Sequence, residues 1–144
     1  MKYSIFAVLV VAGAALVAAA VEAKEASIAG TWTLTVEQKF GLKLILEQKK
    51  SVVTGTLDWP HGDLLKLSGT FVDDTLVFSG DTAGENFTLH VDSTGMRKAN
   101  SALSGTLKAH FDEFNDAHQV VRTRNQEIPW TAVRGLHDVV HFPR

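Results

Sequence analysis

The sequence predicts an all-β protein, an eight-stranded antiparallel up-and-down β-barrel preceded by a signal peptide. From Ala26 onward, apolar side chains recur with a period of two, in short runs separated by Gly, Asp, Asn and Ser, which is the pattern of half-buried strands. A five-residue repeat, in which a central glycine is flanked on each side by a hydroxyl residue and then an apolar residue, occurs three times, at Val53–Leu57, Leu67–Phe71 and Leu103–Leu107. Glycine lacks the Cβ atom that resists sharp coiling, so repeated strand glycines indicate a sheet that curls into a barrel.

The N-terminal segment has the pattern of a secretory signal peptide. Lys2 is followed by an apolar run from Ile5 to Val21 and then by the small residue Ala23, as at a signal cleavage site. We therefore expect a secreted or periplasmic protein with no stable membrane span after cleavage. The apolar run of roughly 17 residues leaves open an uncleaved membrane anchor. The chain divides into a signal peptide, a barrel domain and a C-terminal tail, at residues 1–23, 24–135 and 136–144.

Composition excludes several classes of protein. The chain contains no cysteine, which excludes a disulfide framework and a thiolate metal site. Its formal net charge is -2, with acidic and basic residues interspersed, so it has no basic face for a phosphate backbone and we expect no nucleic acid partner. The mature chain of about 120 residues is long enough for one domain with a single core.

Eight strands follow from the alternating runs and the turn residues between them. The connections at residues 49–51 and 72–74 are short enough for hairpins, so sequence neighbours should pair antiparallel in a meander. The polar segment 112–126 breaks the alternation, and it could be an extended hairpin tip, a one-turn helix or a flap over one barrel mouth. The expected strands lie near residues 31–38, 42–49, 52–58, 65–71, 75–80, 86–92 and 102–111, with the last inside 118–134.

Alternation assigns one face of each strand to an apolar interior and the other to a hydroxyl-rich exterior. The three strand glycines fall on the apolar face, where they serve strand coiling or leave room for a ligand. The predicted interior contains no ionisable side chain, which favours binding or simple stability over catalysis. The interior residues are Trp32, Leu34, Val36, Leu42, Leu44, Leu46, Val53, Leu57, Leu67, Phe71, Leu76, Phe78, Phe87, Leu89, Val91, Leu103 and Leu107. The exterior includes Thr31, Thr33, Thr35, Lys43, Glu47, Thr54, Thr56, Lys66, Ser68, Thr70, Ser79, Thr88, His90, Ser104, Thr106 and Lys108.

The two ends of the barrel sequence carry a bracketing motif. Gly30 and Trp32 open the first strand, and Arg134 closes the last. This arrangement resembles the calycins, the superfamily of lipocalins, fatty-acid-binding proteins and avidins. The resemblance implies that Arg134 packs across the Trp32 indole at the closed end, as a cation–π contact that ties the first strand to the last. The motif order looks like that of avidins and, more closely, like that of small secreted bacterial β-barrel domains.

Two departures from the avidin pattern argue against biotin binding. Avidins place a Tyr after the Thr-Gly-Thr motif and polar Asn and Ser residues after the first Trp. Here Leu57 follows the motif, and Thr33 and Thr35 follow Trp32. A buried polar ligand head needs fixed hydrogen-bond partners, and Leu57 supplies none.

We expect a small apolar molecule in the barrel, or a partner at the mouth loops, with no cofactor; self-association is left open. Two alternatives remain: an enzyme, either a metal-dependent hydrolase or a barrel-type cyclase or isomerase, or a filled barrel that acts as a structural or adhesion module. The interpretation leans away from an enzyme. The predicted ligand contacts in the interior and at the mouth are Trp32, Trp59, His61, Phe71, Phe78, Phe87, Arg124 and Trp130.

Histidines provide the candidates for metal chemistry. His137 and His141 are four residues apart, the spacing that lets two histidines share a helix face and one zinc ion. The stretch has Asp where metalloproteases use Glu and lacks helix caps, so we predict no metal site and a tail that is disordered or lies on the surface. A second cluster could bring His110 and His118 together with the acidic residues between them. The alternative is that both are free surface histidines. Arg122 and Arg124, expected to point outward, could grip an anion or form a solvated face.

Overall fold

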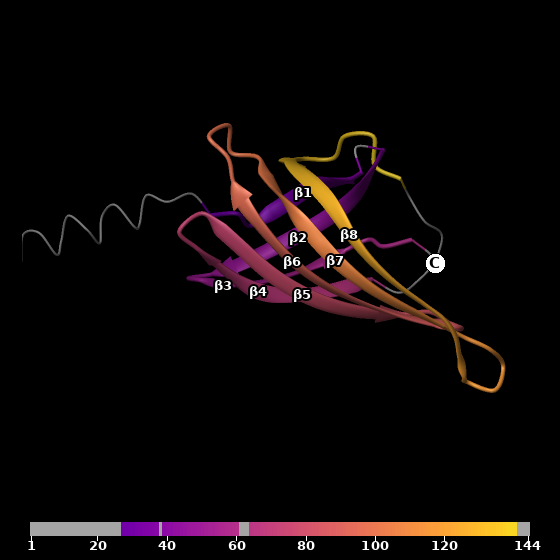
Figure 1. Ribbon diagram of the computed structural model, residues 1–144. Helices are drawn as coiled ribbons and strands as arrows, with labels where there is room; N and C mark the ends of the chain where they lie inside the picture. Colours follow the sequence, from indigo (N-terminus) through magenta and orange to yellow (C-terminus); the bar gives the residue numbers. More distant parts are fainter. Residues whose placement is uncertain (1–26, 38, 61–63, 141–144) are drawn as a thin grey trace, which may run out of the picture.

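The computed structural model describes residues 27–37, 39–60 and 64–140. Its strands form one closed antiparallel barrel in sequence order, completed by the pairing of β1 with β8 (Figure 1). The predicted fold, an eight-stranded antiparallel up-and-down barrel, is confirmed. The predicted signal peptide lies outside the described residues. Within the described part, no helix is long and apolar enough to cross a membrane. The strands are β1 (Gly30–Val36), β2 (Phe40–Lys49), β3 (Val52–Leu57), β4 (Leu65–Val72), β5 (Thr75–Ala83), β6 (Phe87–Arg97), β7 (Leu103–Phe114) and β8 (Val120–Arg134).

The polar segment 112–126 is an extended hairpin tip, which decides between the three sequence alternatives. β7 continues to Phe114 and β8 starts at Val120. In the turn between them, Asn115 Oδ1 accepts hydrogen bonds from the backbone N–H groups of Ala117 and Gln119, at 3.0 Å each. Side chains of Asn stabilise turns in this way, so a polar sequence still closes a regular hairpin.

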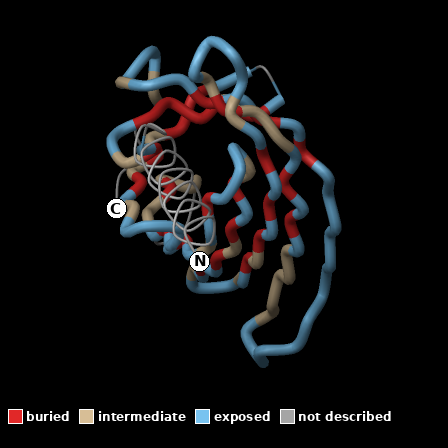
Figure 2. Tube along the Cα trace, turned by 90° about the vertical axis from the view of Figure 1, so that its left-hand side faces the viewer, coloured by how far each residue is buried: buried red, intermediate tan, exposed pale blue. Residues whose placement is uncertain are grey.

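The core fills the barrel as alternation predicts. All the predicted interior residues are buried except Phe87, which is half-buried. In Figure 2 buried residues alternate with exposed ones along the strands, while in the protruding β7–β8 hairpin the β8 strand is a long exposed run and the β7 strand is intermediate. The buried apolar residues that the interior assignment omitted are Ile28, Leu65, Ala109, Ile128, Trp130 and Ala132.

The strand glycines serve close backbone approach. A Cβ atom on Gly69 would lie 1.8 Å from the Val77 carbonyl oxygen, and one on Gly105 would lie 2.2 Å from that of Thr94. Neighbouring backbone therefore occupies the space that a side chain would need. These positions coil the strands, as expected, and leave no room there for a ligand.

The expected exposure of Thr33 is wrong, because the C-terminal tail covers it. Thr33 lies on the outer face but is only 2 % exposed. Its Oγ1 donates to the Gly135 carbonyl at 2.6 Å and accepts from the His137 N–H at 2.9 Å. Further along, the Val140 N–H donates to the Gly41 carbonyl at 3.0 Å. The described part of the tail is thus a strap on the outer surface of β1 and β2.

The two ends of the barrel differ. At the sealed end, where β1 begins and β8 finishes, Trp32 pairs with Arg134. At the other end β1 separates from β8 after Val36 and Trp130, while the β5–β6 and β7–β8 hairpins continue well past the β1–β2 turn (Figure 1). We call this the extended end. There the inner faces of β6, β7 and β8 continue beyond the closed part of the wall.

Candidate functional site

The sealed end is built around Trp32. The Arg134 guanidinium carbon lies 4.5 Å from the Trp32 ring centroid, and the guanidinium donates from Nη1 to the Ala29 carbonyl at 2.8 Å and from Nη2 to the Ser27 carbonyl. Gly30 has φ of 132°, and a Cβ there would lie 3.0 Å from Arg134 Nη1. The first and last strands are therefore tied together at this end, with a backbone conformation that favours glycine.

A second cation covers the sealed end beside this pair, and the sequence reasoning missed it. The Arg97 guanidinium carbon lies 5.1 Å from the Phe71 ring centroid. The same side chain binds Asp74 Oδ1 through Nε at 3.0 Å and Nη2 at 2.6 Å. Phe71, a predicted ligand contact, is 5 % exposed beneath it. Its ring therefore belongs to the seal.

The middle of the barrel is packed and its polar atoms are paired. Trp130 Nε1 donates to Ser93 Oγ at 2.8 Å, and Ser93 Oγ donates to the Thr106 carbonyl at 3.0 Å. The Phe78 ring lies 6.1 Å from the Trp130 ring. Within the described residues, every buried side-chain nitrogen and oxygen has a hydrogen-bond partner. Phe78 and Trp130, predicted ligand contacts, are thus committed to core packing here, as Trp32 is at the sealed end. The middle layer presents no unpaired polar atom to a ligand head.

The extended end holds a partly covered aromatic group. The Phe87 and Phe111 rings stack with centroids 5.3 Å apart and an interplanar angle of 26°. Both are half-buried, and together with half-buried Trp59 they pack against the core. Phe87 and Trp59 were predicted contacts, whereas Phe111 was missed. Continuing the alternation from Leu107 by two more steps would have found it. His61, the remaining mouth candidate, lies outside the described residues.

Arg124 lies beside this aromatic group in the strand register. It is paired with Phe111 across β7 and β8, on the face that continues the barrel interior. The expectation that it points outward is therefore wrong, although the position is exposed because the barrel wall has ended there. Arg122, on the same face, lies 3.7 Å from Glu113 through its Nε. The arrangement puts a guanidinium next to an aromatic surface.

The candidate histidines of the tail and the hairpin are separately placed in the part of the chain that the structure describes. His137 Nε2 lies 2.8 Å from the Arg134 carbonyl oxygen, and His141 lies outside the described residues. His118 is an exposed turn residue with φ of 57°, and His110 instead contacts Asn125 and Asp112. Within the part of the chain that the structure describes, no group of three His, Cys, Asp or Glu side chains could hold a metal ion.

His90 and His110 are cross-strand neighbours on the outer face of β6 and β7. His90 Nδ1 lies 2.7 Å from Asp81 Oδ1 and its Nε2 lies 3.0 Å from Asp92 Oδ2. The hydrogen bond to Asp81, reinforced by Asp92, raises the pKa of His90 above its ordinary value. A shallow hollow of about 320 Å³ lies over this pair.

His110 belongs to the same polar band and has its own partners. Its Nδ1 lies 2.7 Å from Asn125 Oδ1, and its Nε2 lies 3.1 Å from Asp112 Oδ2. The bond to Asn125 and then that to Asp112 raise the pKa of His110, and the Thr123 hydroxyl, followed by His110, lowers the pKa of Asp112. Protonated histidines are therefore favoured along this band.

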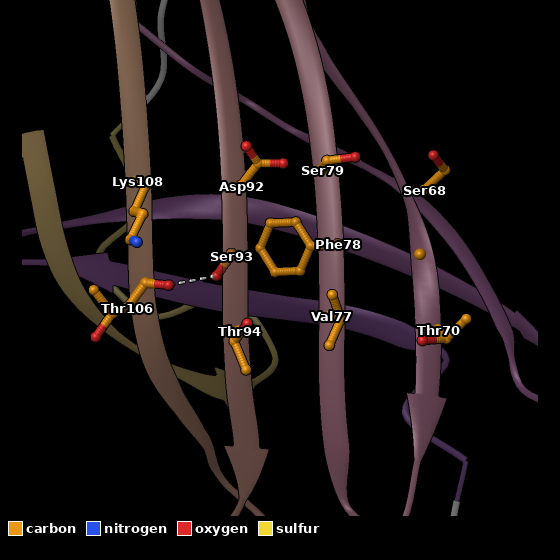
Figure 3. A pocket seen from close by; sticks show the side chains of 11 residues that line it. Ser68, Thr70, Val77, Phe78, Ser79, Asp92, Ser93, Thr94, Thr106 and Lys108 are labelled. Atoms are coloured by element: carbon orange, nitrogen blue, oxygen red, sulfur yellow. Dashed lines mark hydrogen bonds between the residues drawn. The ribbon is translucent and has the colours of Figure 1, made fainter. Parts of the chain in front are cut away.

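A further hollow lies outside the barrel wall. It has a volume of about 510 Å³ and spans the outer face of β4 to β7. Figure 3 shows its two rows of side chains, which match the strand register. Hydroxyl groups predominate in the two rows, in which Val77, 45 % exposed, is the apolar member; Gly69, Phe78 and Ser93 line the hollow between the rows. The rows are Ser68, Ser79, Asp92 and Lys108, and Thr70, Val77, Thr94 and Thr106.

Comparison with known proteins places the fold. No protein-family model matches the sequence, and a search of curated proteins finds no match. Among solved structures, a crystal structure of the rhizavidin–biotin complex matches with a TM-score of 0.50 and 13 % sequence identity, over 80 % of this chain and 99 % of that chain. At this identity the likeness concerns the backbone arrangement and carries no ligand across. The protein therefore has a closed eight-stranded antiparallel barrel fold like that of rhizavidin.

Proposed function

We propose that this protein is an exported binding protein that holds a small apolar molecule at the extended end of its barrel. The observation that carries the proposal is the stacked pair Phe87 and Phe111, which packs against the core but stays partly exposed. Aromatic rings that are anchored on one side and uncovered on the other offer apolar area without a large loss of side-chain freedom.

The rest of the interior directs the proposal to this end. Arg134 and Arg97 cap the opposite end, and the Trp130 layer is packed with its polar atoms satisfied. A ligand that entered the middle of the barrel would have to displace core side chains, at a cost of several kcal/mol. At the extended end it would instead cover rings that water already reaches, so burial of the ligand and of the rings would both contribute to affinity.

The chemistry of the described residues favours binding over catalysis. Their buried polar side chains are Thr33, Thr82 and Ser93. None of these is an acid or base, and Ser93 is bonded to Trp130 and to the Thr106 carbonyl. An apolar ligand would therefore be chosen by shape and by contact with aromatic rings.

Fluorescence titration of the mature protein tests the proposal. The probe is N-phenyl-1-naphthylamine, an uncharged apolar dye that brightens on leaving water, and retinol serves as a second probe. We expect saturable binding with one site per chain, and about tenfold weaker binding for Phe111→Ser, because a large apolar contact is lost. Val77→Ser is the matched control, since it removes an exposed apolar side chain from the outer hollow.

The outcomes separate the candidate functions. Weaker binding in Phe111→Ser but not in Val77→Ser supports the extended end, provided that both variants keep the wild-type unfolding midpoint. The reverse pattern would place the site on the outer wall and contradict the proposal. Absence of binding by either probe would favour the alternative of a filled barrel that acts as a structural or adhesion module.

Export is the second part of the proposal and needs its own measurement. The support is the charged, apolar and small-residue order of residues 1–23. Intact-mass analysis of the protein recovered from the medium or periplasm of an expressing bacterium should give a chain that starts at Lys24, or near it. A full-length chain in the membrane fraction would instead support the uncleaved anchor.

A further inference from the structure

The protruding part of β8 has a free edge. β8 runs from Val120 to Arg134, but β1 pairs with it only from Trp130 to Arg134. Over Val120–Ile128 its sole strand neighbour in the described part of the chain is β7. Residues 120–127 are all exposed, as the outer strand of the protruding hairpin in Figures 1 and 2 illustrates. An unpaired strand edge of this length is a template for another strand.

The backbone groups that face the free edge can be assigned from the pairing of β8 with β1. The Pro129 carbonyl accepts from the Glu37 N–H at 3.2 Å, and the Gly135 N–H donates to the Thr31 carbonyl at 2.8 Å. Odd-numbered residues of β8 therefore direct their backbone groups toward the β1 side, and even-numbered residues direct theirs toward β7. On the free edge, the N–H and C=O groups of Thr123, Asn125 and Glu127 are the ones that face outward.

The side chains of these three residues do not cover the edge, because each is engaged on the outer face with β7. Thr123 Oγ1 donates to Asp112 at 2.7 Å, Asn125 Oδ1 lies 2.7 Å from His110, and Glu127 lies 3.9 Å from Lys108. The alternate residues, on the inner face, are Arg122, Arg124 and Gln126. The guanidinium groups of Arg122 and Arg124 therefore favour an added strand that carries acidic side chains.

A second copy of this chain fits the edge poorly. In a two-fold symmetric antiparallel pairing of two such edges, inner-face residues lie opposite inner-face residues. The two-fold axis therefore passes through one residue of the edge, which lies opposite its own copy. Centring on residue 122, 123 or 124 sets Arg122 against itself, Arg122 against Arg124, or Arg124 against itself. Like charges directly opposite each other are destabilising. Centring on residue 125 or beyond avoids these contacts but pairs residues 122–128 at most, because Pro129 is already bonded to Glu37.

We propose that the free edge of β8 binds an extended, acidic segment of a partner protein, which adds to the sheet as a further strand. Arg122 already has Glu113 at 3.7 Å, whereas the described ion pairs leave Arg124 without a carboxylate. A carboxylate of the incoming strand opposite Arg124 supplies that partner, and main-chain hydrogen bonds to Thr123, Asn125 and Glu127 fix its direction. Val120 and Val121, 53 % and 59 % exposed, add apolar contact near the hairpin tip.

Peptide binding measured by fluorescence anisotropy tests this proposal. Two fluorescein-labelled peptides as long as the free edge are compared, one alternating threonine with glutamate and one alternating threonine with lysine. We expect the glutamate peptide to bind and the lysine peptide not to bind. Arg124→Glu should weaken binding of the glutamate peptide by about tenfold or more, as the loss of a close interfacial charge pair does. Lys66→Glu, which reverses an exposed charge on β4, is the control.

A second pair of variants separates edge pairing from simple charge attraction. Glu127→Pro removes an edge-facing N–H, and proline is tolerated where that group faces solvent. Glu127→Ala loses the same exposed carboxylate and keeps the N–H. We expect the proline variant to lose binding of the glutamate peptide and the alanine variant to keep it. Equal binding by both variants, equal binding of both peptides, or no binding of either peptide would overturn the proposal, and so would a dimer in sedimentation that Glu127→Pro converts to monomer.

Discussion

Arg134 and Trp32 join the last strand of the barrel to the first, with the guanidinium carbon 4.5 Å from the indole centroid and Nη1 bonded to the Ala29 carbonyl at 2.8 Å. The fork of donors matters here as much as the charge, because two carbonyls of the segment before β1 are bound at once. A single cation therefore fixes both the ring beneath it and the chain that enters the barrel.

Replacing Arg134 should destabilise the barrel. We expect Arg134→Ala to lower the free energy of unfolding by about 1–2 kcal/mol, the sum of an exposed cation–π contact and one or two hydrogen bonds. Urea denaturation followed by tryptophan fluorescence measures this. Arg134→Lys keeps the charge but not the fork, so it should recover less than half of the loss. Full recovery with Lys would show that charge alone is sufficient.

Gly69 should not accept a side chain. We expect Gly69→Ala to lower the free energy of unfolding by about 3 kcal/mol, because the new Cβ would lie 1.8 Å from the Val77 carbonyl oxygen and backbone must move to admit it. The neighbouring exposed change Ser68→Ala is the control and should stay within about 0.5 kcal/mol of wild type. Thermal and urea unfolding of both variants provide the comparison, and a Gly69→Ala protein of unchanged stability would refute the close-approach explanation.

The Ser93 hydroxyl should matter mainly through Trp130. Ser93→Ala leaves the buried indole N–H without its acceptor, so we expect a loss of about 1–3 kcal/mol in the free energy of unfolding. In a Trp130→Phe background the same serine change should cost clearly less, because the orphaned donor is absent. A double-mutant cycle measures the difference. Additive effects of the two substitutions would mean that the hydrogen bond contributes nothing.

The histidines of the outer face should make stability depend on pH. Because the folded state raises the pKa of His90 and of His110, the protonated form favours folding. Their contribution is complete below the unfolded pKa of about 6.5 and is lost as pH rises through the folded pKa values. NMR titration should give folded pKa values above the ordinary value for both rings, and a lower one for His90 in Asp81→Asn. Unchanged titration of His90 in that variant would argue against the Asp81 contact.

The fold could be predicted because its signals are local. The period of two placed side chains such as Leu44 and Val91 correctly on the inner face, and the repeated glycines marked the coiled positions. Residues outside the strict alternation were harder. Ile28 precedes β1, and its side chain is buried in the core while its carbonyl accepts from Trp32 Nε1 at 2.9 Å, contacts that no pattern within a strand reveals.

The candidate site was predicted less well, because it depends on contacts between distant segments. Thr33 looked like other outer threonines and is buried only because the tail returns over it, 102 residues later in the chain. Phe71 read as a ligand contact, but the unrecognised Arg97 covers it. Arg124 lies on the inner face and yet is exposed, because β8 has parted from β1 there, and the sequence does not show where that happens. Each of these outcomes requires the closed ring of strands, which is a property of the whole chain.

The hydrogen bond from Arg134 Nη2 to the Ser27 carbonyl brings together two residues 107 positions apart in the chain. The start and the end of the barrel sequence are therefore neighbours in space, so the chain termini could be moved to one of the other turns. In a circular permutant, a flexible linker would connect the C-terminal tail to the segment before β1 and leave the tail docked. The new chain would start at the two-residue turn of Lys50 and Ser51, between β2 and β3. Such a chain should rebuild the same set of neighbours. The same cut between Asp73 and Asp74 should do worse, since it would loosen the carboxylate that holds Arg97.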